Sequence, residues 1–182
     1  MARIIAIANQ KGGVAKTTTA VNLSSSLVEK GQKVLLVDLD PQGNATSGCG
    51  IHKHRLSRCI YDVIINEEDI RNIIVDTELK ELKVAPARIE LAGAEIELVS
   101  QFYREGKLAT ALREIKNEYD FILIDCPPSL GLLTLNALCA ATDVLIPIQC
   151  EYYALEGLSL LINTLEKVNR SINRDLKIIG VL

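Results

Sequence analysis

The feature that most constrains the fold of this chain is the regular alternation of short β-branched runs with stretches that repeat apolar residues at helical spacing. Strands that alternate with helices in this way form right-handed βαβ units. The expected strands are residues 3–9, 33–38, 83–85, 120–125, 144–149 and 177–182. The expected helices are residues 16–30, 56–65, 89–99, 107–118, 132–140 and 155–168, with a loop at 41–50. The sequence therefore predicts a three-layer α/β fold with a mainly parallel, twisted sheet flanked by helices.

The composition agrees with a single domain built around a buried sheet. The 182 residues suffice to bury a large core, and 48% of them are hydrophobic. There are five Tyr, two Phe and no Trp, so the apolar content is mostly aliphatic, as in buried parallel strands. The net charge of -3 argues against bulk attraction to nucleic acid, although it leaves room for a local basic patch. The scarcity of aromatic rings also argues against a protein that binds single strands by stacking.

Cysteine and histidine usage gives no sign of a metal site or a disulfide framework. The five cysteines contain no Cys-x-x-Cys pair and the two histidines stand close together at 52 and 54, so no zinc-binding spacing can be assembled. We expect free thiols in a reduced cytosolic protein. The N-terminus lacks the layout of a signal peptide. Residues 131–148 are interrupted by Asn136, Asp143 and Pro147, which favours a helix followed by a core strand over a membrane span.

A glycine-rich turn with two lysines lies between the first expected strand and the first expected helix. It reads Lys11-Gly12-Gly13-Val14-Ala15-Lys16-Thr17-Thr18. In this context the backbone N–H groups of the turn and of the first helical turn form a concavity for phosphate oxygens. Lys16 would reach the β- and γ-phosphates, and the Thr17 hydroxyl would bind Mg²⁺. Because the usual phosphate loop has glycine where this chain has Ala15, we expect Ala15 to adopt the negative φ of a helix start.

Carboxylates follow two other expected strands, at the edge of the sheet where the glycine-rich turn lies. Asp125 ends an apolar strand, a place where a carboxylate is costly unless it faces a cation or strong donors. A water-mediated contact to Mg²⁺ near Thr17 would satisfy it. Asp38 and Asp40 stand at the end of the second expected strand. The sequence therefore predicts a phosphate and Mg²⁺ site at this edge.

The glycine-rich turn resembles the deviant Walker A motif of the ParA/MinD ATPases, and Lys11 corresponds to the extra signature lysine of that motif. Further segments are similar to the chromosomal ParA (Soj) branch of the family, in the same order along the chain. These segments are residues 37–46, 91–95, 124–129 and 149–157. The resemblance covers essentially the whole chain. It implies a P-loop NTPase fold and an ATPase that hydrolyses ATP to ADP and phosphate with Mg²⁺.

The resemblance assigns the carboxylates more finely. Asp40 would position the attacking water, while Asp38 would support the Mg²⁺ shell that Thr17 and Asp125 also build. The nucleotide itself would be bound by Asp125 and by the residues of the turn. These turn residues are Gly12, Gly13, Val14, Ala15, Lys16, Thr17 and Thr18.

The resemblance also implies that two subunits share the site. Lys11 would cross to the phosphates of the second subunit in a nucleotide-sandwich dimer, where its charge would stabilise the transition state. Lys11, Lys16 and Asp40 would thus form the catalytic set. Pro127-Pro128 would stiffen a switch segment that responds to the γ-phosphate. By analogy alone, Glu151 would contact the nucleotide of the second subunit.

The implied function is chromosome or plasmid partitioning in a bacterial or archaeal cytoplasm, with the protein associated with the nucleoid. ATP-bound homodimers would bind DNA non-specifically, and a ParB-type centromere-binding protein would stimulate hydrolysis, without any membrane partner. The chain ends inside a strand-like apolar run. We therefore expect residues 1–182 to be a single nucleotide-binding domain, truncated at its C-terminus before most of its DNA-binding residues.

Three alternatives stay open at this point. A MinD-like ATPase that positions the division site would need a C-terminal amphipathic membrane helix. A relative of the nitrogenase iron protein would need cluster-ligating cysteines at the dimer axis, for which Cys126 beside Asp125 is poorly placed. A truncated nucleotide-binding module without turnover would keep the turn but would not dimerise with ATP and Mg²⁺.

Overall fold

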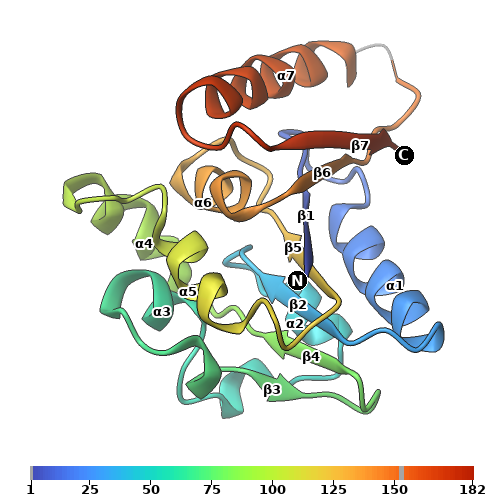
Figure 1. Ribbon diagram of the computed structural model, residues 1–182, viewed down its shortest axis with the longest axis vertical. Coiled ribbons are helices and arrows are strands. Elements are labelled where there is room, and N and C mark those ends of the chain that lie inside the picture. The colour runs from blue at the N-terminus through green and yellow to red at the C-terminus, as the bar shows by residue number, and fades with distance from the viewer. Residues whose placement is uncertain (1, 152–153) are drawn as a thin grey trace.

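The computed structural model describes residues 2–151 and 154–182. Within these residues seven strands form one sheet, in the order β3-β4-β2-β5-β1-β6-β7 (Figure 1). The strands are β1 (Arg3–Ile7), β2 (Val34–Asp38), β3 (Val75–Asp76), β4 (Leu82–Ala85), β5 (Phe121–Asp125), β6 (Asp143–Ile146) and β7 (Lys177–Val181). The helices are α1 (Lys16–Glu29), α2 (Asn44–Gly48), α3 (Ile60–Asn66), α4 (Leu91–Glu97), α5 (Lys107–Ile115), α6 (Leu132–Ala140) and α7 (Ala154–Ser171). The predicted α/β fold with a mainly parallel sheet is confirmed.

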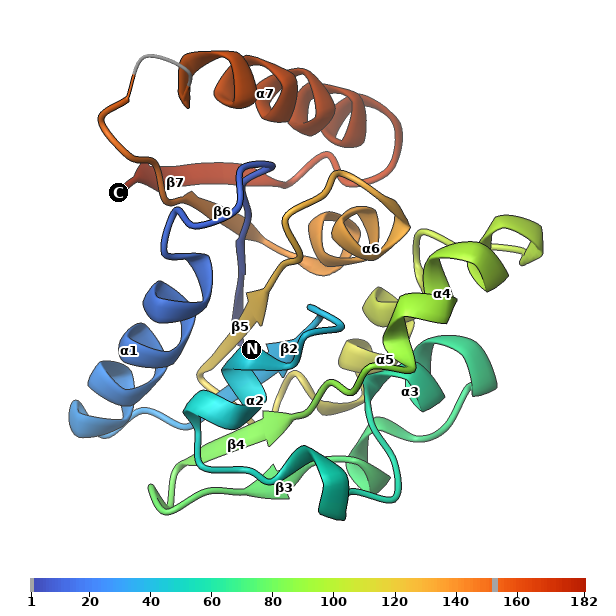
Figure 2. The ribbon, with the colours of Figure 1, turned by 180° about the vertical axis from the view of Figure 1, so that it is seen from behind.

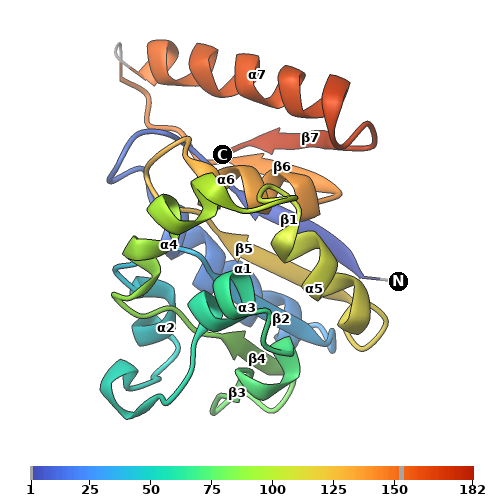
Figure 3. The ribbon, with the colours of Figure 1, turned by 90° about the vertical axis from the view of Figure 1, so that its left-hand side faces the viewer.

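The sheet is buried on both faces because its side chains alternate between two apolar cores. Along β1, Ile4 and Ala6 pack into one core. Ile5 and Ile7 pack into the other. Helices α1 and α2 cover the second face (Figure 2), and α3 to α6 lie over the first (Figure 3). Two covered faces explain why the strands are continuous aliphatic runs rather than alternating apolar and polar residues.

The central strands end at the same level. β5 lies between β1 and β2, and Asp125 pairs with Ile7 of β1 and with Asp38 of β2. The segments that leave β1, β2 and β5 therefore emerge side by side at one edge of the sheet. This register brings the glycine-rich turn next to the two carboxylates at the strand ends.

Two elements differ from the sequence-based expectation. The predicted loop at 41–50 contains helix α2, although its residues are polar or small. The Asp38 carboxylate accepts a hydrogen bond from the Thr46 backbone N–H in the first turn of α2, at 2.8 Å, and so caps a helix that its own sequence would not favour. Strand β3 was not expected, and it pairs with β4 in the antiparallel direction.

The long apolar stretch at 131–148 divides into α6 and β6, as expected. Among the described residues, no helix combines the length and the apolar character needed to cross a bilayer. All five cysteines are free thiols; four are buried or half-buried, as expected of core thiols, and Cys150 is exposed.

Candidate functional site

The glycine-rich turn connects β1 to α1 and contains a strained residue. Ala15 has φ 64° and ψ 27°, in the left-handed region that alanine rarely adopts. The expected negative φ at Ala15 was therefore wrong. The helix begins one residue later, at Lys16, so Ala15 is the N-cap and still belongs to the turn. Alanine adopts here a conformation that glycine would adopt without strain, at a cost of about 1–2 kcal/mol.

Two amides far apart in the sequence hold the turn in place. Asn9 is buried; its Oδ1 accepts from the Lys11 backbone N–H at 3.0 Å, and its Nδ2 donates to the Pro147 carbonyl at 2.6 Å. Gln149 Nε2 donates to the Gly13 carbonyl at 3.1 Å. These bonds tie the turn to the segment that follows β6. Neither Asn9 nor Gln149 was predicted from the sequence to hold the turn. The one signal for this role is a polar amide directly after an apolar strand.

A cavity of about 450 Å³ opens over the turn, and we call it the P-loop cavity. Its lining residues are Gly12, Gly13, Ala15, Lys16, Thr17, Thr18, Asp40, Gln42, Asn44 and Pro128. Most of the predicted nucleotide-binding residues are thus brought together. Two of them lie outside the lining. The Val14 side chain is buried, which leaves only its backbone N–H for a phosphate, and Asp125 is fully buried at the end of β5. Sequence reasoning gave no role to Gln42 and Asn44.

Lys16 is buried at the start of α1, and its Nζ donates to the Lys11 carbonyl at 3.0 Å. Burial lowers the pKa of this ammonium, whereas the nearby carboxylates of Asp125 and Asp40 act to raise it. A cation in this position attracts anions into the cavity. In this structure the Lys11 carbonyl of the turn is its hydrogen-bond partner.

Asp125 is fully buried at the end of β5, and neither of its carboxylate oxygens has a hydrogen-bond partner among the described residues. Burial raises the pKa of this carboxyl to about 7, and the neighbouring Asp38 and Asp40 act in the same direction. The Thr17 hydroxyl and the Lys16 ammonium act in the opposite direction. A buried carboxylate without partners is costly unless a cation or water reaches it. Thr17 and Asp125 therefore provide hard oxygen donors that fit Mg²⁺.

Asp38 is also fully buried, but its oxygens are engaged. Oδ2 accepts from the Thr46 backbone N–H at 2.8 Å and from the Thr46 hydroxyl at 2.7 Å, and Oδ1 accepts from the Asp40 backbone N–H at 3.1 Å. Burial raises the pKa of Asp38 to about 6 while the hydrogen bonds from Thr46 lower it. Asp38 thus anchors the loop that carries Asp40 to the cavity. Its role in the Mg²⁺ shell stays a prediction.

Asp40 lines the P-loop cavity, as the sequence predicted, and its Oδ1 accepts from the Gln42 backbone N–H at 2.9 Å. This bond holds the carboxylate within the turn that leads into α2. One side of the carboxylate is therefore engaged by the protein, while the residue as a whole still faces the cavity.

Lys11 lies outside the lining of the P-loop cavity. Its Nζ forms an ion pair with the Glu151 carboxylate of the same chain, and both side chains are exposed. The structure therefore pairs, within one chain, two residues that were each expected to contact the nucleotide of a second subunit. Those intersubunit roles stay predictions. Residues 152–153 of the family-like segment 149–157 lie outside the described residues.

Another family-like segment, residues 91–95, contributes a helix cap. The Glu95 carboxylate on α4 accepts from the backbone N–H groups of Leu132 and Leu133 at 2.9 and 3.1 Å. A side chain at Gly131 would collide with it, because a Cβ there would lie 2.5 Å from the Glu95 carboxylate oxygens. Glu95 thereby fixes the start of α6, directly after the segment that contains Pro127 and Pro128.

The comparisons with known proteins agree with this geometry. A family model described as an AAA domain matches residues 2–178. The sporulation initiation inhibitor protein Soj of Bacillus subtilis is 59% identical over 182 residues, which are 100% of this chain and 72% of that protein. The chromosome partitioning protein ParA of Myxococcus xanthus is 57% identical over 180 residues, which are 99% of this chain and 64% of that protein.

Solved structures lead to the same fold. The structure of cobyrinic acid a,c-diamide synthase from Mycobacterium smegmatis, with bound ADP and magnesium, has a TM-score of 0.96 and 44% identity. It covers 100% of this chain, which spans 74% of that one. A plasmid partition protein from Borrelia burgdorferi has a TM-score of 0.86 and 31% identity, covering 100% of this chain and 78% of its own. With a family match across nearly all its residues and Soj and ParA relatives at these identities, the chain belongs to the Soj/ParA family of P-loop partitioning ATPases.

Proposed function

We propose that this chain binds Mg-ATP in the P-loop cavity and hydrolyses it in an ATP-dependent homodimer that serves chromosome or plasmid partitioning. The observation that carries the proposal is Asp125, a fully buried carboxylate without a hydrogen-bond partner in the described part of the chain, beside the Thr17 hydroxyl. Such an arrangement is costly in the empty protein and favourable with a divalent cation. Support also comes from the ADP and magnesium bound in the related structure from Mycobacterium smegmatis.

In this proposal the residues of the cavity divide the work. Backbone N–H groups from Gly12 to Thr18 bind the phosphates at the N-terminus of α1. Lys16 exchanges its present contact with the Lys11 carbonyl for phosphate oxygens. Thr17 and Asp125 hold Mg²⁺, which when bound neutralises charge that develops on the phosphates. Asp40 orients the attacking water, and the hydrogen bond that its carboxylate accepts from the Gln42 backbone N–H holds it within the turn.

Lys11 is proposed to act in trans. In the single chain it pairs with Glu151, and exposed ion pairs of this kind contribute only about 0–1 kcal/mol. Lys11 is therefore easily released to the phosphates of a second subunit, where a cation supplied in trans accelerates phosphoryl transfer by about 10³–10⁵-fold. The dimer would thus form only when ATP is bound.

The biological setting is inferred from the family. Soj and ParA relatives support a partitioning role, in which the dimer binds DNA non-specifically in the nucleoid of the cytoplasm. A ParB-type protein would stimulate hydrolysis. The chain spans 72% of the length of the Soj relative.

The test measures phosphate release and oligomeric state with ATP and Mg²⁺. Asp40→Ala should bind ATP and form the dimer but lose turnover by about 100-fold or more. Lys11→Ala should bind ATP as a monomer. Lys30→Ala, at the exposed C-terminal end of α1, is the matched control and should behave as wild type. Undiminished turnover of Asp40→Ala, or an unchanged ATP-dependent dimer of Lys11→Ala, would contradict the mechanism. A ParB-type peptide and DNA, added separately and together, test the partner.

A further inference from the structure

A second and larger cavity, of about 830 Å³, lies between α3, α5 and the loop that follows α4. None of its lining residues also lines the P-loop cavity. Its apolar wall consists of Val63, Ile65, Ile70, Phe102, Tyr103 and Ala111. We call this cavity the α3–α5 groove. Its size is in the range of sites that take a whole ligand or several side chains.

Two aromatic side chains stand exposed at the groove. Phe102 is 95% exposed and Tyr103 is 62% exposed, in a chain that has only two Phe. The backbone that presents them is strained, because Tyr103 has φ 52°. The Tyr103 ring also packs against Gly106, where an added Cβ would lie 2.1 Å from the ring. The loop is thus held in an uncommon conformation that exposes two aromatic rings to solvent. These rings would become buried only in contact with a bound molecule.

Acidic side chains predominate around the groove. Its lining carries Glu67, Glu68, Asp69 and Glu114 against a single cation, Lys107. Lys107 is already paired with Glu67 at 2.7 Å. Arg58 pairs with Glu68 at 3.1 Å. Carboxylates therefore remain in excess even when the neighbouring arginines are included.

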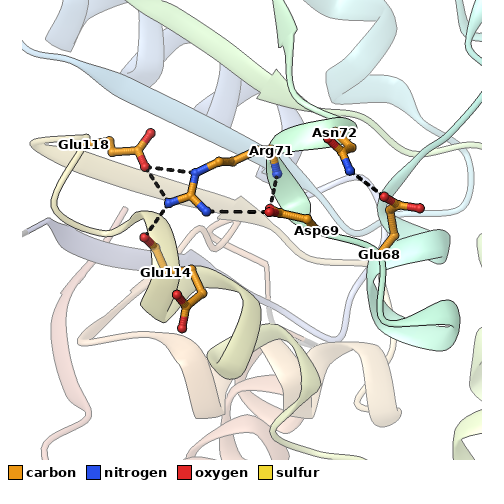
Figure 4. Close-up of polar contacts among 6 residues, drawn as sticks. All are labelled: Glu68, Asp69, Arg71, Asn72, Glu114 and Glu118. Atoms are coloured by element: carbon orange, nitrogen blue, oxygen red, sulfur yellow. Dashed lines mark hydrogen bonds and ion pairs between the residues drawn. The ribbon is translucent and has the colours of Figure 1, made fainter.

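Figure 4 shows how the acidic side of the groove is arranged around Arg71. The guanidinium contacts the carboxylates of Glu118, at 2.8 Å, and Asp69, at 3.7 Å. At Glu114 the guanidinium donates only to the backbone carbonyl, at 2.8 Å, while the Glu114 carboxylate points away from it. Within the described part of the chain, the Glu114 carboxylate has neither an ion-pair nor a hydrogen-bond partner. It is the anion most available to a partner.

The groove also contains an unused hydrogen-bond acceptor. Gln101 is one of its lining residues, and its Oε1 is buried without a hydrogen-bond partner among the described residues. Buried polar atoms are nearly always paired in native proteins. A donor brought in by a bound molecule would satisfy this one.

We propose that the α3–α5 groove docks a basic, amphipathic segment of a partner protein. Apolar side chains of that segment pack against Phe102 and the wall of the groove, while its Lys or Arg side chains meet Glu114 and the acidic residues 67–69. A small ligand confined to the cavity would leave Phe102 in solvent. Self-association of this chain through the groove is the alternative that the test separates from docking of a basic segment. The proposal is independent of the nucleotide site.

The test uses fluorescence anisotropy with labelled amphipathic helical peptides that share the same apolar positions. Their polar positions carry Lys, Gln or Glu. At low ionic strength the Lys peptide should bind and the Glu peptide should not, and added salt should weaken binding. Phe102→Ala should weaken binding by about tenfold or more, as for a central aromatic contact. Glu114→Lys should weaken it similarly and shift the preference toward the Glu peptide.

Matched controls separate docking from folding. Ile96→Ala removes an apolar side chain on α4 that is 78% exposed, and Glu78→Lys makes the same charge change outside the groove. Both should leave the peptide affinity unchanged, and all four variants should keep wild-type ATP binding. Failure of the Lys peptide to bind would overturn the proposal, and so would equal binding of the Glu peptide or equal losses in the controls. Concentration-dependent self-association that Phe102→Ala abolishes would instead assign the groove to a second copy.

Discussion

The P-loop cavity and the α3–α5 groove are concave for different reasons. The P-loop cavity lies at the ends of three paired strands, and its walls are backbone groups and buried polar side chains such as Lys16 and Asp40. The groove lies between helices and a loop, and its walls are apolar side chains with exposed carboxylates around them. In the first region, paired strands hold buried charged side chains in place. In the second, a strained loop exposes apolar side chains to solvent. The difference indicates a small, highly charged ligand for one and a polypeptide for the other.

The largest expected effect is a loss of ATP affinity that leaves peptide binding to the groove unchanged. Lys16→Ala removes the buried ammonium that faces the phosphates, and charge-assisted contacts of this kind contribute about 1.5–3 kcal/mol each. We expect ATP affinity to fall by about 100-fold or more, while binding of the basic peptide to the groove stays the same. Titration with a fluorescent ATP analogue and with the labelled peptide measures both. Normal nucleotide affinity in Lys16→Ala would remove the P-loop assignment, and lost peptide binding would show that the two regions are not separate.

The second prediction tests how strongly buried hydrogen bonds at the P-loop cavity stabilise the protein. Thr46→Val removes the hydroxyl that donates to Asp38 at 2.7 Å and accepts from the Ala87 backbone N–H at 3.0 Å, and so leaves two buried polar groups each short of one hydrogen bond. The loss should destabilise the protein by about 2–3 kcal/mol in urea unfolding. In the groove, Glu114→Gln should change stability by less than about 0.5 kcal/mol, because that carboxylate is exposed to solvent and has no partner among the described residues. Equal effects would contradict the contrast between the P-loop cavity and the groove.

The third prediction concerns the raised pKa of Asp125 and its effect on the stability of the ligand-free protein. Its pKa in the folded protein is raised to about 7 from an ordinary value of 3.8. Between these values the folded protein keeps a proton that the unfolded chain has released, so the contribution of Asp125 makes the ligand-free protein less stable as the pH rises. Asp125→Asn removes this effect and should stabilise the ligand-free protein by about 2 kcal/mol at pH 8 but little near pH 4.

Thermal unfolding at several pH values, without Mg²⁺ and then with Mg-ATP, measures this change. Mg-ATP should stabilise the wild type and fail to stabilise Asp125→Asn to the same extent. A gap between variant and wild type that does not widen with pH would mean that the carboxylate is already satisfied without a cation.

The comparison also explains what could be predicted from the sequence. Lys16, Thr17 and Asp125 were predictable because each stands in a local pattern whose chemistry is specific. Asn9 and Thr46 were not, because they act on backbone or carboxylate groups that only the fold brings close, as in the Asn9 contact to Pro147. Helix α2 was expected as a loop for the same reason, since its cap comes from the end of β2. The groove has no motif at all, because its residues come from separate segments whose only shared property is position.

The smallest expected effect concerns Ala15, the one residue of the turn at which the local expectation was reversed. Its left-handed conformation costs alanine about 1–2 kcal/mol, and glycine would avoid that cost while losing about 0.5–1 kcal/mol through a more flexible unfolded chain. Ala15→Gly should therefore stabilise the protein by about 0.5–1 kcal/mol in urea unfolding. Ala92→Gly, at an exposed helical position of α4, is the matched control and should destabilise by about the same amount. If both substitutions destabilise, Ala15 contributes a side-chain contact that outweighs its strain, and the turn is held by packing as well as by the amides of Asn9 and Gln149.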